Sequence, residues 1–156
     1  GLAMMAALKI DTTHMTLHQL RDEVRDRVAN TTQSTTIMFQ SFAFKHGVPV
    51  DADFVFDARF LPNPHWEADL RPLTGLDASV RDFVLQREEC QDFLRGLLAL
   101  LETVLPHYAT EGKSYLTLAI GCTGGPHRSV AVAEEIGLRL RSSGQPIRVS
   151  HRDISR

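Results

Sequence analysis

The chain has 156 residues, of which 43% are hydrophobic and 23% are charged, and its formal net charge is -2. This length and composition predict a single folded domain and exclude a disordered or fibrous chain. The slightly negative net charge also excludes a protein that coats nucleic acid through bulk positive charge, so any nucleic-acid contact must be local.

The start of the chain and its cysteines bear on location. Residues 1–8 are apolar, but they are too few to span a bilayer and lack the basic flank of a signal peptide. We therefore expect no membrane association, and we interpret residues 1–10 as a tag remnant or linker before a domain over residues 11–156. Cys90 and Cys122 are far apart in the sequence and predict reduced thiols in a cytoplasmic protein.

The first half of the chain predicts one helix and two strands. Thr16 and Gln19 form a capping-box pattern before an apolar stripe, which predicts a helix over about residues 17–29. The apolar runs 37–42 and 54–57 predict buried strands. The prolines of residues 59–64 forbid regular structure, so a shaped loop follows the second strand.

The second half predicts a long helix and then a strand, a loop, a helix and a strand. Apolar positions between Phe93 and Leu105 mark the long helix, which Pro106 and Gly112 are expected to end. The last four elements are expected at residues 115–120, 121–129, 130–140 and 147–150. Such a β-α-β unit predicts a single α/β domain in which a small, mostly parallel sheet is flanked by helices.

The glycine-rich loop GCTGGPHRS, residues 121–129, predicts an oxyanion site. The first N–H groups of a helix lack partners within the helix and carry its positive dipole end, so anions bind there. Gly121, Gly124 and Gly125 are expected to allow positive φ angles and a close approach of the backbone to the ligand. The phosphate-binding candidates of this loop are Cys122, Thr123, Gly124, Gly125, His127, Arg128 and Ser129.

Cys122 and Arg128 also fit C-x-x-G-x-x-R-S, the spacing of cysteine-dependent phosphatases, in which a thiolate attacks the phosphate and an arginine clamps it. Gly121 stands where those enzymes have a histidine, Pro126 removes a backbone donor, and no aspartate is an obvious general acid. We favour a binding site without catalysis. A phosphatase and a purely structural tight turn remain as alternatives.

A second polar cluster follows the first two predicted strands. Residues 41–47 and 56–66 are expected at the carboxyl ends of the strands, where ligands bind in open α/β sheets. Their candidates for contacts with a phosphate or with sugar hydroxyls are Lys45, His46, Arg59, Asn63 and His65. Asp51, Asp53 and Asp57 are expected to cap turns or hold Arg59. No metal site is predicted, because no paired Cys/His spacing occurs.

The last part of the chain is locally basic. Arg148, His151, Arg152 and Arg156 could contact RNA phosphates, and a solvated tail fits the same residues equally well.

Three motifs in order, SFAFKHGVPVDADFVFDARFLPNPHW, LRPLTGLD and GKSYLTLAIGCTGGPHRSVAVAE, closely resemble the RapZ/YvcJ family of bacterial nucleotide-binding proteins. In that family ATP or GTP binds an N-terminal P-loop domain, and this chain has no G-x-x-x-x-G-K-[ST] motif. The resemblance therefore implies the C-terminal domain alone, with no cofactor of its own and no nucleotide hydrolysis.

The resemblance also implies partners. It predicts a sensor that binds a glucosamine-6-phosphate-like amino-sugar phosphate on residues 121–129, with His46 and His65 beside it. Small regulatory RNA, ribonuclease E and further copies of the chain are the expected macromolecular partners. Two residues or segments depart from the family pattern: Ala43 replaces a glycine, and the chain ends HRDISR without a lysine- and arginine-rich tail. A module that only oligomerises the P-loop domain is a further alternative.

Overall fold

The structure of the protein is a computed structural model, which describes residues 16–21 and 35–156. Four strands form one sheet in the order β2-β3-β1-β4, and every neighbouring pair is parallel. The strands are β1 (Thr36–Ala43), β2 (Phe54–Asp57), β3 (Tyr115–Cys122) and β4 (Ile147–His151). The predicted α/β class with a small parallel sheet is confirmed.

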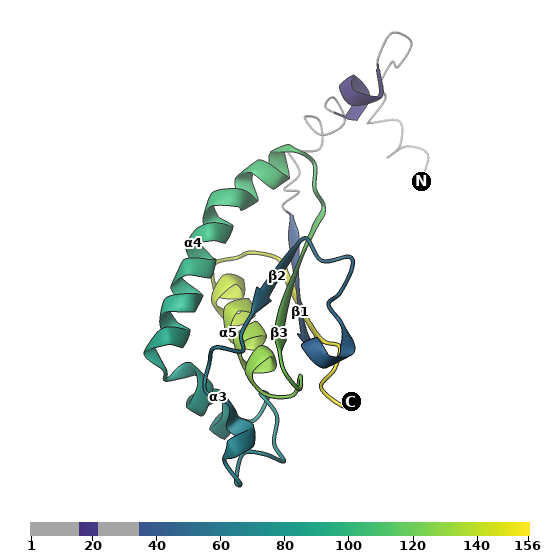
Figure 1. The fold of residues 1–156 in the computed structure, drawn as a ribbon. Coiled ribbons are helices and arrows are strands. Elements are labelled where there is room, and N and C mark those ends of the chain that lie inside the picture. Colours follow the sequence, from purple (N-terminus) through teal and green to yellow (C-terminus); the bar gives the residue numbers. More distant parts are fainter. Residues whose placement is uncertain (1–15, 22–34) are drawn as a thin grey trace, which may run out of the picture.

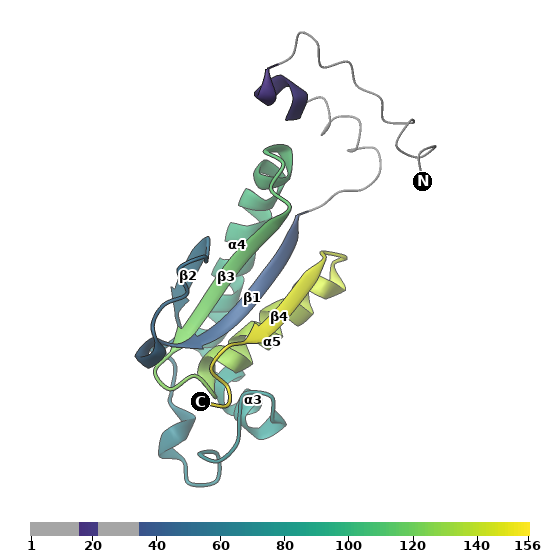
Figure 2. The same cartoon turned by 90° about the vertical axis from the view of Figure 1, so that its right-hand side faces the viewer.

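Helices cover one face of this sheet, as Figure 1 shows. In Figure 2 the strands face the viewer, and α4 (Glu88–Thr110) and α5 (Arg128–Ser142) lie behind them. α3 (Ala78–Leu85) lies near the carboxyl-terminal ends of the strands and contacts both other helices. Two one-turn helices, η2 (Phe44–His46) and η3 (Pro64–Trp66), stand in the segments that follow β1 and β2.

The hydrophobic core lies between the sheet and these helices. Along β1, Ile37 and Phe39 are fully buried and Met38 between them is partly exposed, because successive side chains of a strand point to opposite faces. Burying a side chain of this size stabilises the fold by about 1.5–3 kcal/mol. The largest fully buried side chains include Phe39, Phe42, Ile37, Leu94, Leu101, Leu116, Leu118, Ile120 and Ile136.

α3 has no counterpart in the sequence analysis. Val80 and Val84 are buried along this helix, and Phe83 and Leu85 pack against the core, but eight residues are too few for recognition by periodicity. Asp77 precedes the helix and accepts a hydrogen bond from the backbone N–H of Thr74 at 2.8 Å, which closes the turn that leads into it. The motif LRPLTGLD therefore forms the entry to α3.

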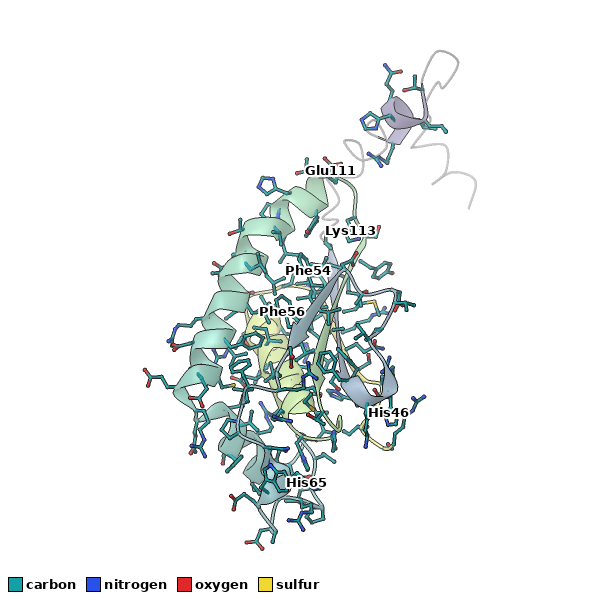
Figure 3. All side chains as sticks on the ribbon, viewed as in Figure 1. His46, Phe54, Phe56, His65, Glu111 and Lys113 are labelled. Carbon is teal, nitrogen blue, oxygen red and sulfur yellow. The ribbon has the colours of Figure 1, made fainter. Side chains whose placement is uncertain are left out.

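The prediction that Pro106 ends the long helix is wrong, since α4 continues through it to Thr110. The added turn places the ring of Tyr108 against that of Phe54 on β2, with centroids 6.4 Å apart. Figure 3 shows Phe54 between β2 and α4. This packing offsets the hydrogen bond that a proline removes. Gly112, with a φ of 80°, then follows the helix end as expected.

The predicted capping box at the N-terminal side is present. Thr16 N–H donates to Gln19 Oε1 at 3.0 Å, and Gln19 N–H donates to Thr16 Oγ1 at 3.2 Å, ahead of a helical segment at residues 17–21. The rest of the helix predicted to residue 29, and the proposed remnant at residues 1–10, lie outside the described residues. No helix within the described ranges has the length and apolar character needed to cross a bilayer.

Three polar side chains connect β1, β4 and α5. The ring of His151 contacts Ser41 Oγ through Nδ1 at 2.7 Å and Glu134 Oε1 through Nε2 at 2.6 Å. Ser41 is fully buried, so this serine–histidine–glutamate arrangement offers no exposed nucleophile. Its role is to hold strands and helix together.

Candidate anion-binding site

A pocket of about 340 Å³ lies at the carboxyl-terminal ends of β1 and β3, where α5 begins. Ligands of open α/β folds bind at this edge of the sheet. The volume is at the small end of the range for small-molecule sites, roughly 300–1,000 Å³. Figure 3 shows His65, one of the lining residues, beyond this end of the sheet. The lining also includes Asn63, Trp66, Cys122, Thr123, Gly124 and Pro126.

The charge of the lining is one-sided. Its cationic or imidazole side chains are Lys45, His65, His127, Arg128 and Arg156, and no aspartate or glutamate lines the pocket. Lys45 is exposed and makes no hydrogen bond or ion pair with any residue that the structure describes. The N-terminus of α5 adds the positive end of a helix dipole. The pocket is therefore suited to an anion.

The glycines of the loop differ from the prediction in their backbone conformation and in what they contact. Among the described glycines of this loop only Gly125 has a positive φ, at 94°, so the prediction is wrong for Gly121 and Gly124. Gly121 is a residue of β3, and a Cβ there would lie 2.5 Å from the ring of Phe42 and 2.6 Å from that of Phe44. Its absence of a side chain makes room for two aromatic rings rather than for a ligand.

Arg128 is committed partly to the fold. Its side chain is buried, and Nη1 donates to the carbonyl oxygens of Arg59 and Leu61 at 2.8 and 3.0 Å. Nη2 donates to Thr123 Oγ1 at 3.3 Å. The sequence predicts a phosphate donor in the whole guanidinium, whereas in the structure one arm ties the start of α5 to the loop after β2.

His127 and Arg128 each keep hydrogen-bonding capacity that the described residues do not use. Nε2 of His127 and Nε of Arg128 are buried without a hydrogen-bond partner among the described residues. Burial lowers the pKa of His127, an effect that the backbone carbonyls of Leu73 and Arg71 only partly oppose. The imidazole is therefore neutral at pH 7, and it meets a ligand as a hydrogen-bonding group rather than as a charge.

Cys122 is buried at the end of β3, and its Sγ lies 3.1 Å from Ser129 Oγ on the first turn of α5. This pair closes the base of the loop across seven residues of sequence. Ser129 Oγ also lies 3.5 Å from the carbonyl oxygen of Gly125. The pair therefore helps to hold the strand-to-helix turn in shape.

The part of the chain that forms the sheet and the pocket matches a known protein family. A family model for the RapZ C-terminal domain matches residues 35–155, which include the whole sheet and every residue of the pocket except Arg156. The chain belongs to the RapZ C-terminal domain family. The predicted resemblance is thereby confirmed.

Curated relatives of this RapZ-family domain are named nucleotide-binding proteins. A protein of Frankia casuarinae is 52% identical over 155 residues, covering 97% of this chain and 53% of the relative. A protein of Tolumonas auensis is 46% identical over 156 residues, covering 99% and 54%. One of Geobacter metallireducens is 48% identical over 158 residues, covering 100% and 55%. The chain spans about half the length of the curated relatives it matches.

Most, but not all, of the predicted site residues line the pocket of this RapZ-family domain. His46 is exposed on η2 (Figure 3) and is not part of the lining. Arg59 is held by Asp57 at 2.7 Å, as predicted, and its guanidinium lies 3.9 Å from the ring centroid of Phe44. The predicted residues that line the pocket are Lys45, Asn63, His65, Cys122, Thr123, Gly124, His127 and Arg128, and those that do not are His46, Arg59, Gly125 and Ser129.

The four RNA-binding candidates lie in different environments. His151 and Arg152 are held by hydrogen bonds inside the protein. Arg148 is exposed on β4, the edge strand, and Arg156 lines the pocket. RNA binding by these residues stays a prediction. No group of three or more metal-ligating side chains gathers within residues 16–21 and 35–156.

Sequence reasoning missed three contributors to the site. Trp66 and Pro126 line the pocket, and Trp66 stays 75% exposed there. Gly75 packs on the loop from outside: its N–H donates to the carbonyl of Pro126 at 2.7 Å. A tryptophan next to a histidine in the motif FLPNPHW, which follows a predicted strand, was an available signal for Trp66. No local pattern pointed to Gly75, because its contact is made through the fold.

Asp153 fixes the C-terminal end of the chain against the site. It is fully buried, and its Oδ2 accepts hydrogen bonds from the backbone N–H of Ala43 and from Arg152 Nη2, both at 2.8 Å. Its backbone also packs on the loop, since a Cβ on Gly125 would lie 3.1 Å from the carbonyl oxygen of Asp153. The methyl group of Ala43 lies beside these groups, since a Cβ on Gly125 would lie 3.0 Å from it.

Acid should destabilise the domain through Asp153. Burial raises the pKa of this carboxyl group, but hydrogen bonds from Arg152 and Ala43 outweigh burial and leave the pKa below its usual value. A lowered folded-state pKa stabilises the fold above the unfolded value of about 3.9, and the contribution is lost as the pH falls through the folded-state pKa. We expect the urea midpoint of the wild type to fall steeply below about pH 4.

The control for this prediction is Asp153→Asn, which keeps an acceptor for Ala43 and cannot ionise. Its free energy of unfolding is lower at neutral pH and falls less steeply below about pH 4. A pH dependence equal to that of the wild type would assign the acid sensitivity to other carboxylates.

Proposed function

We propose that this domain binds a phosphorylated amino sugar of the glucosamine-6-phosphate type in the pocket at the start of α5, and that it acts as a cytoplasmic sensor without performing chemistry. One observation carries the proposal: a small pocket at a helix N-terminus is lined by five cationic or imidazole side chains and, among the described residues, by no aspartate or glutamate side chain. A phosphate group supplies the negative charge that balances this lining.

The proposed phosphate contacts come from two sides of the pocket. Thr123, the unused N–H groups of Arg128 and the first N–H groups of α5 form one side. Lys45 on η2 forms the other side as a charge without an intramolecular partner among the described residues. Because Arg128 already holds the loop after β2, a bound phosphate would connect three segments through one guanidinium.

The proposed sugar contacts come from the loop around η3. Trp66 presents an exposed indole, whose flat apolar face suits the CH face of a pyranose ring. Its ring lies edge-on to that of His65, with centroids 5.5 Å apart. Asn63 also lines the pocket, and its Oδ1 accepts the backbone N–H of His65 at 3.1 Å, which leaves the amide NH₂ for a sugar hydroxyl.

Lys45→Ala tests the proposal, because this side chain can be removed without breaking an intramolecular contact. We expect glucosamine-6-phosphate to bind the wild type and the variant to bind it about tenfold or more weakly, the loss of one charge-assisted hydrogen bond. Titration calorimetry measures both affinities. Arg141→Ala removes an exposed charge at the far end of α5 and serves as the control. If the wild type binds neither the sugar phosphate nor inorganic phosphate, the proposal fails.

Trp66→Ala separates recognition of the sugar from recognition of the phosphate. We expect the affinity for glucosamine-6-phosphate to fall about five- to tenfold and the affinity for inorganic phosphate to stay unchanged, because only the sugar reaches the indole. Parallel titrations of the two ligands check this. Equal losses for both would place Trp66 in a structural role.

A cysteine-dependent phosphatase is the second candidate, and the 3.1 Å contact between Cys122 Sγ and Ser129 Oγ favours it. Against it, one arm of Arg128 is bound to backbone carbonyls, and no carboxylate lines the pocket as a general acid. Hydrolysis of an aryl phosphate that disappears in Cys122→Ser would support the phosphatase. Binding of a sugar phosphate without turnover supports the sensor.

We infer that a macromolecular partner recognises whether the pocket is occupied, and the candidate partners are small regulatory RNA and ribonuclease E. We also infer that the domain self-associates. The relatives carry the name nucleotide-binding protein, and we assign ATP or GTP binding to the half of their length that this chain does not span. A domain that served only to oligomerise would gain no thermal stability from sugar phosphates, so a shift in melting temperature decides between the two roles.

A further inference from the structure

We infer that residues 152–156 form a latch of the pocket, and that Arg156 binds the ligand and thereby fixes the latch in place. The inference rests on the proposed anion site. It adds a ligand-binding residue from a segment outside the glycine-rich loop, and it adds a conformational consequence of binding at the end of the described chain.

The root of the latch is anchored firmly. The backbone N–H of Arg152 donates to the carbonyl oxygen of Ser41 at 3.0 Å, which extends the pairing of β4 with β1 by one residue. Its guanidinium donates to the carbonyl of Gly47 and to Asp153. Asp153 in turn accepts the N–H of Ala43. The latch therefore leaves the sheet at a fixed point beside the pocket.

The tip of the latch is held weakly. Arg156 lines the pocket, its side chain is 59% exposed, and its Nη1 lies 3.4 Å from Asp153 Oδ1. That oxygen has no hydrogen bond among the described residues, so the contact is an ion pair without hydrogen-bond alignment. Asp153 is buried, but the guanidinium of Arg156 is largely in solvent, which screens its attraction to the carboxylate and weakens the pair. The guanidinium of Arg156 therefore lies beside the anion site, and only a weak ion pair with Asp153 holds it there.

An oxyanion in the pocket is a better partner for Arg156 than Asp153 is. A phosphate presents several oxygens to the planar guanidinium and allows two parallel hydrogen bonds, which are stronger than a single long ion pair. Arg156 can bind the phosphate while staying near Asp153, because Arg156 lines the pocket and Asp153 lies three residues before it in the same segment. Ligand binding then immobilises residues 154–156, the tip of the latch.

The latch and the glycine-rich loop are also in direct contact. A Cβ on Gly125 would lie 3.1 Å from both Cβ and the carbonyl oxygen of Asp153, so no space separates the two segments. Coupling between two sites is reciprocal: if the anion fixes the latch, a fixed latch raises the affinity for the anion. The end of the described chain thus reports whether the pocket is occupied.

Arg156→Gln tests the latch, with Arg141→Gln as the matched loss of one exposed positive charge. Titration calorimetry gives the dissociation constant for inorganic phosphate, and hydrogen exchange follows the backbone amides of residues 154–156 with and without saturating phosphate. We expect Arg156→Gln to weaken phosphate binding about five- to twentyfold and to lose the slowing of exchange that phosphate causes in the wild type. Arg141→Gln should match the wild type in both measurements.

The outcomes separate this inference from the proposed function. If Lys45→Ala weakens phosphate binding while Arg156→Gln keeps wild-type affinity, the anion site stands and the latch is overturned. Wild-type slowing of exchange in saturated Arg156→Gln also overturns the latch, because the immobilisation then does not pass through the guanidinium. If the wild type binds no phosphate at all, the proposed function itself fails.

Discussion

Arg128→Ala should abolish phosphate binding and lower the free energy of unfolding by about 3–5 kcal/mol. The loss of stability arises because the carbonyl oxygens of Arg59 and Leu61 lose their donor and a buried side chain leaves a cavity. The loss of binding arises because the loop after β2 is released from the start of α5. Urea denaturation and titration with phosphate measure the two effects on the same protein.

Arg128→Lys distinguishes charge from geometry. A lysine restores the positive charge but cannot donate to both carbonyls and to Thr123 at once, since it lacks the planar fork. We expect stability between those of the wild type and Arg128→Ala, with phosphate binding still weakened. A free energy of unfolding of Arg128→Ala within about 1 kcal/mol of the wild type would show that the contacts of Nη1 are dispensable.

Gly75→Ala should be the second severe substitution, with a loss of about 3 kcal/mol or more in the free energy of unfolding. An added Cβ would lie 2.4 Å from the carbonyl oxygen of His127 and 2.5 Å from the backbone N of Ala131. Both are backbone atoms of the first turn of α5, so neither can rotate away. The segment before α3 must therefore separate from the helix that carries the pocket.

Gly96→Ala is the matched control for this effect. Gly96 is exposed inside α4, and an added Cβ there meets nothing within 4 Å. Alanine favours the helix over glycine by up to about 1 kcal/mol, so we expect unchanged or slightly greater stability. Thermal unfolding compares the two variants. Equal stability of Gly75→Ala and Gly96→Ala would contradict the packing described for Gly75.

The elements with long, regular patterns could be predicted from the sequence, and those that depend on tertiary contacts could not. β3 and α5 follow from an apolar run, a glycine-rich turn and helical spacing, all within residues 115–142. Tyr108 belongs to α4 only because β2 offers it the ring of Phe54, and no local rule carries a helix through Pro106 for that reason. α3 was missed because its eight residues are too few to show a helical period.

The candidate site divides in the same way. The residues near the end of β3 and His65 stand in polar motifs directly after strands, which is a local signal for the ligand edge of a parallel sheet. The partners of Arg128 lie 67 and 69 residues away in the chain, so its structural task was invisible in the sequence. The place of Arg156 in the pocket depends likewise on the pairing of β4 with β1.

The strand order β2-β3-β1-β4 has a consequence for folding kinetics. No two strands are joined by a hairpin, and the contact between Ser41 and His151 closes 110 residues of chain, so the loop-closure entropy is spent before most contacts form. Arg156 reaches the pocket only after β4 has joined β1. The complete binding site therefore forms only when the whole sheet has formed. A ligand that contacts the segments after all four strands would slow unfolding of the whole domain rather than protect one loop.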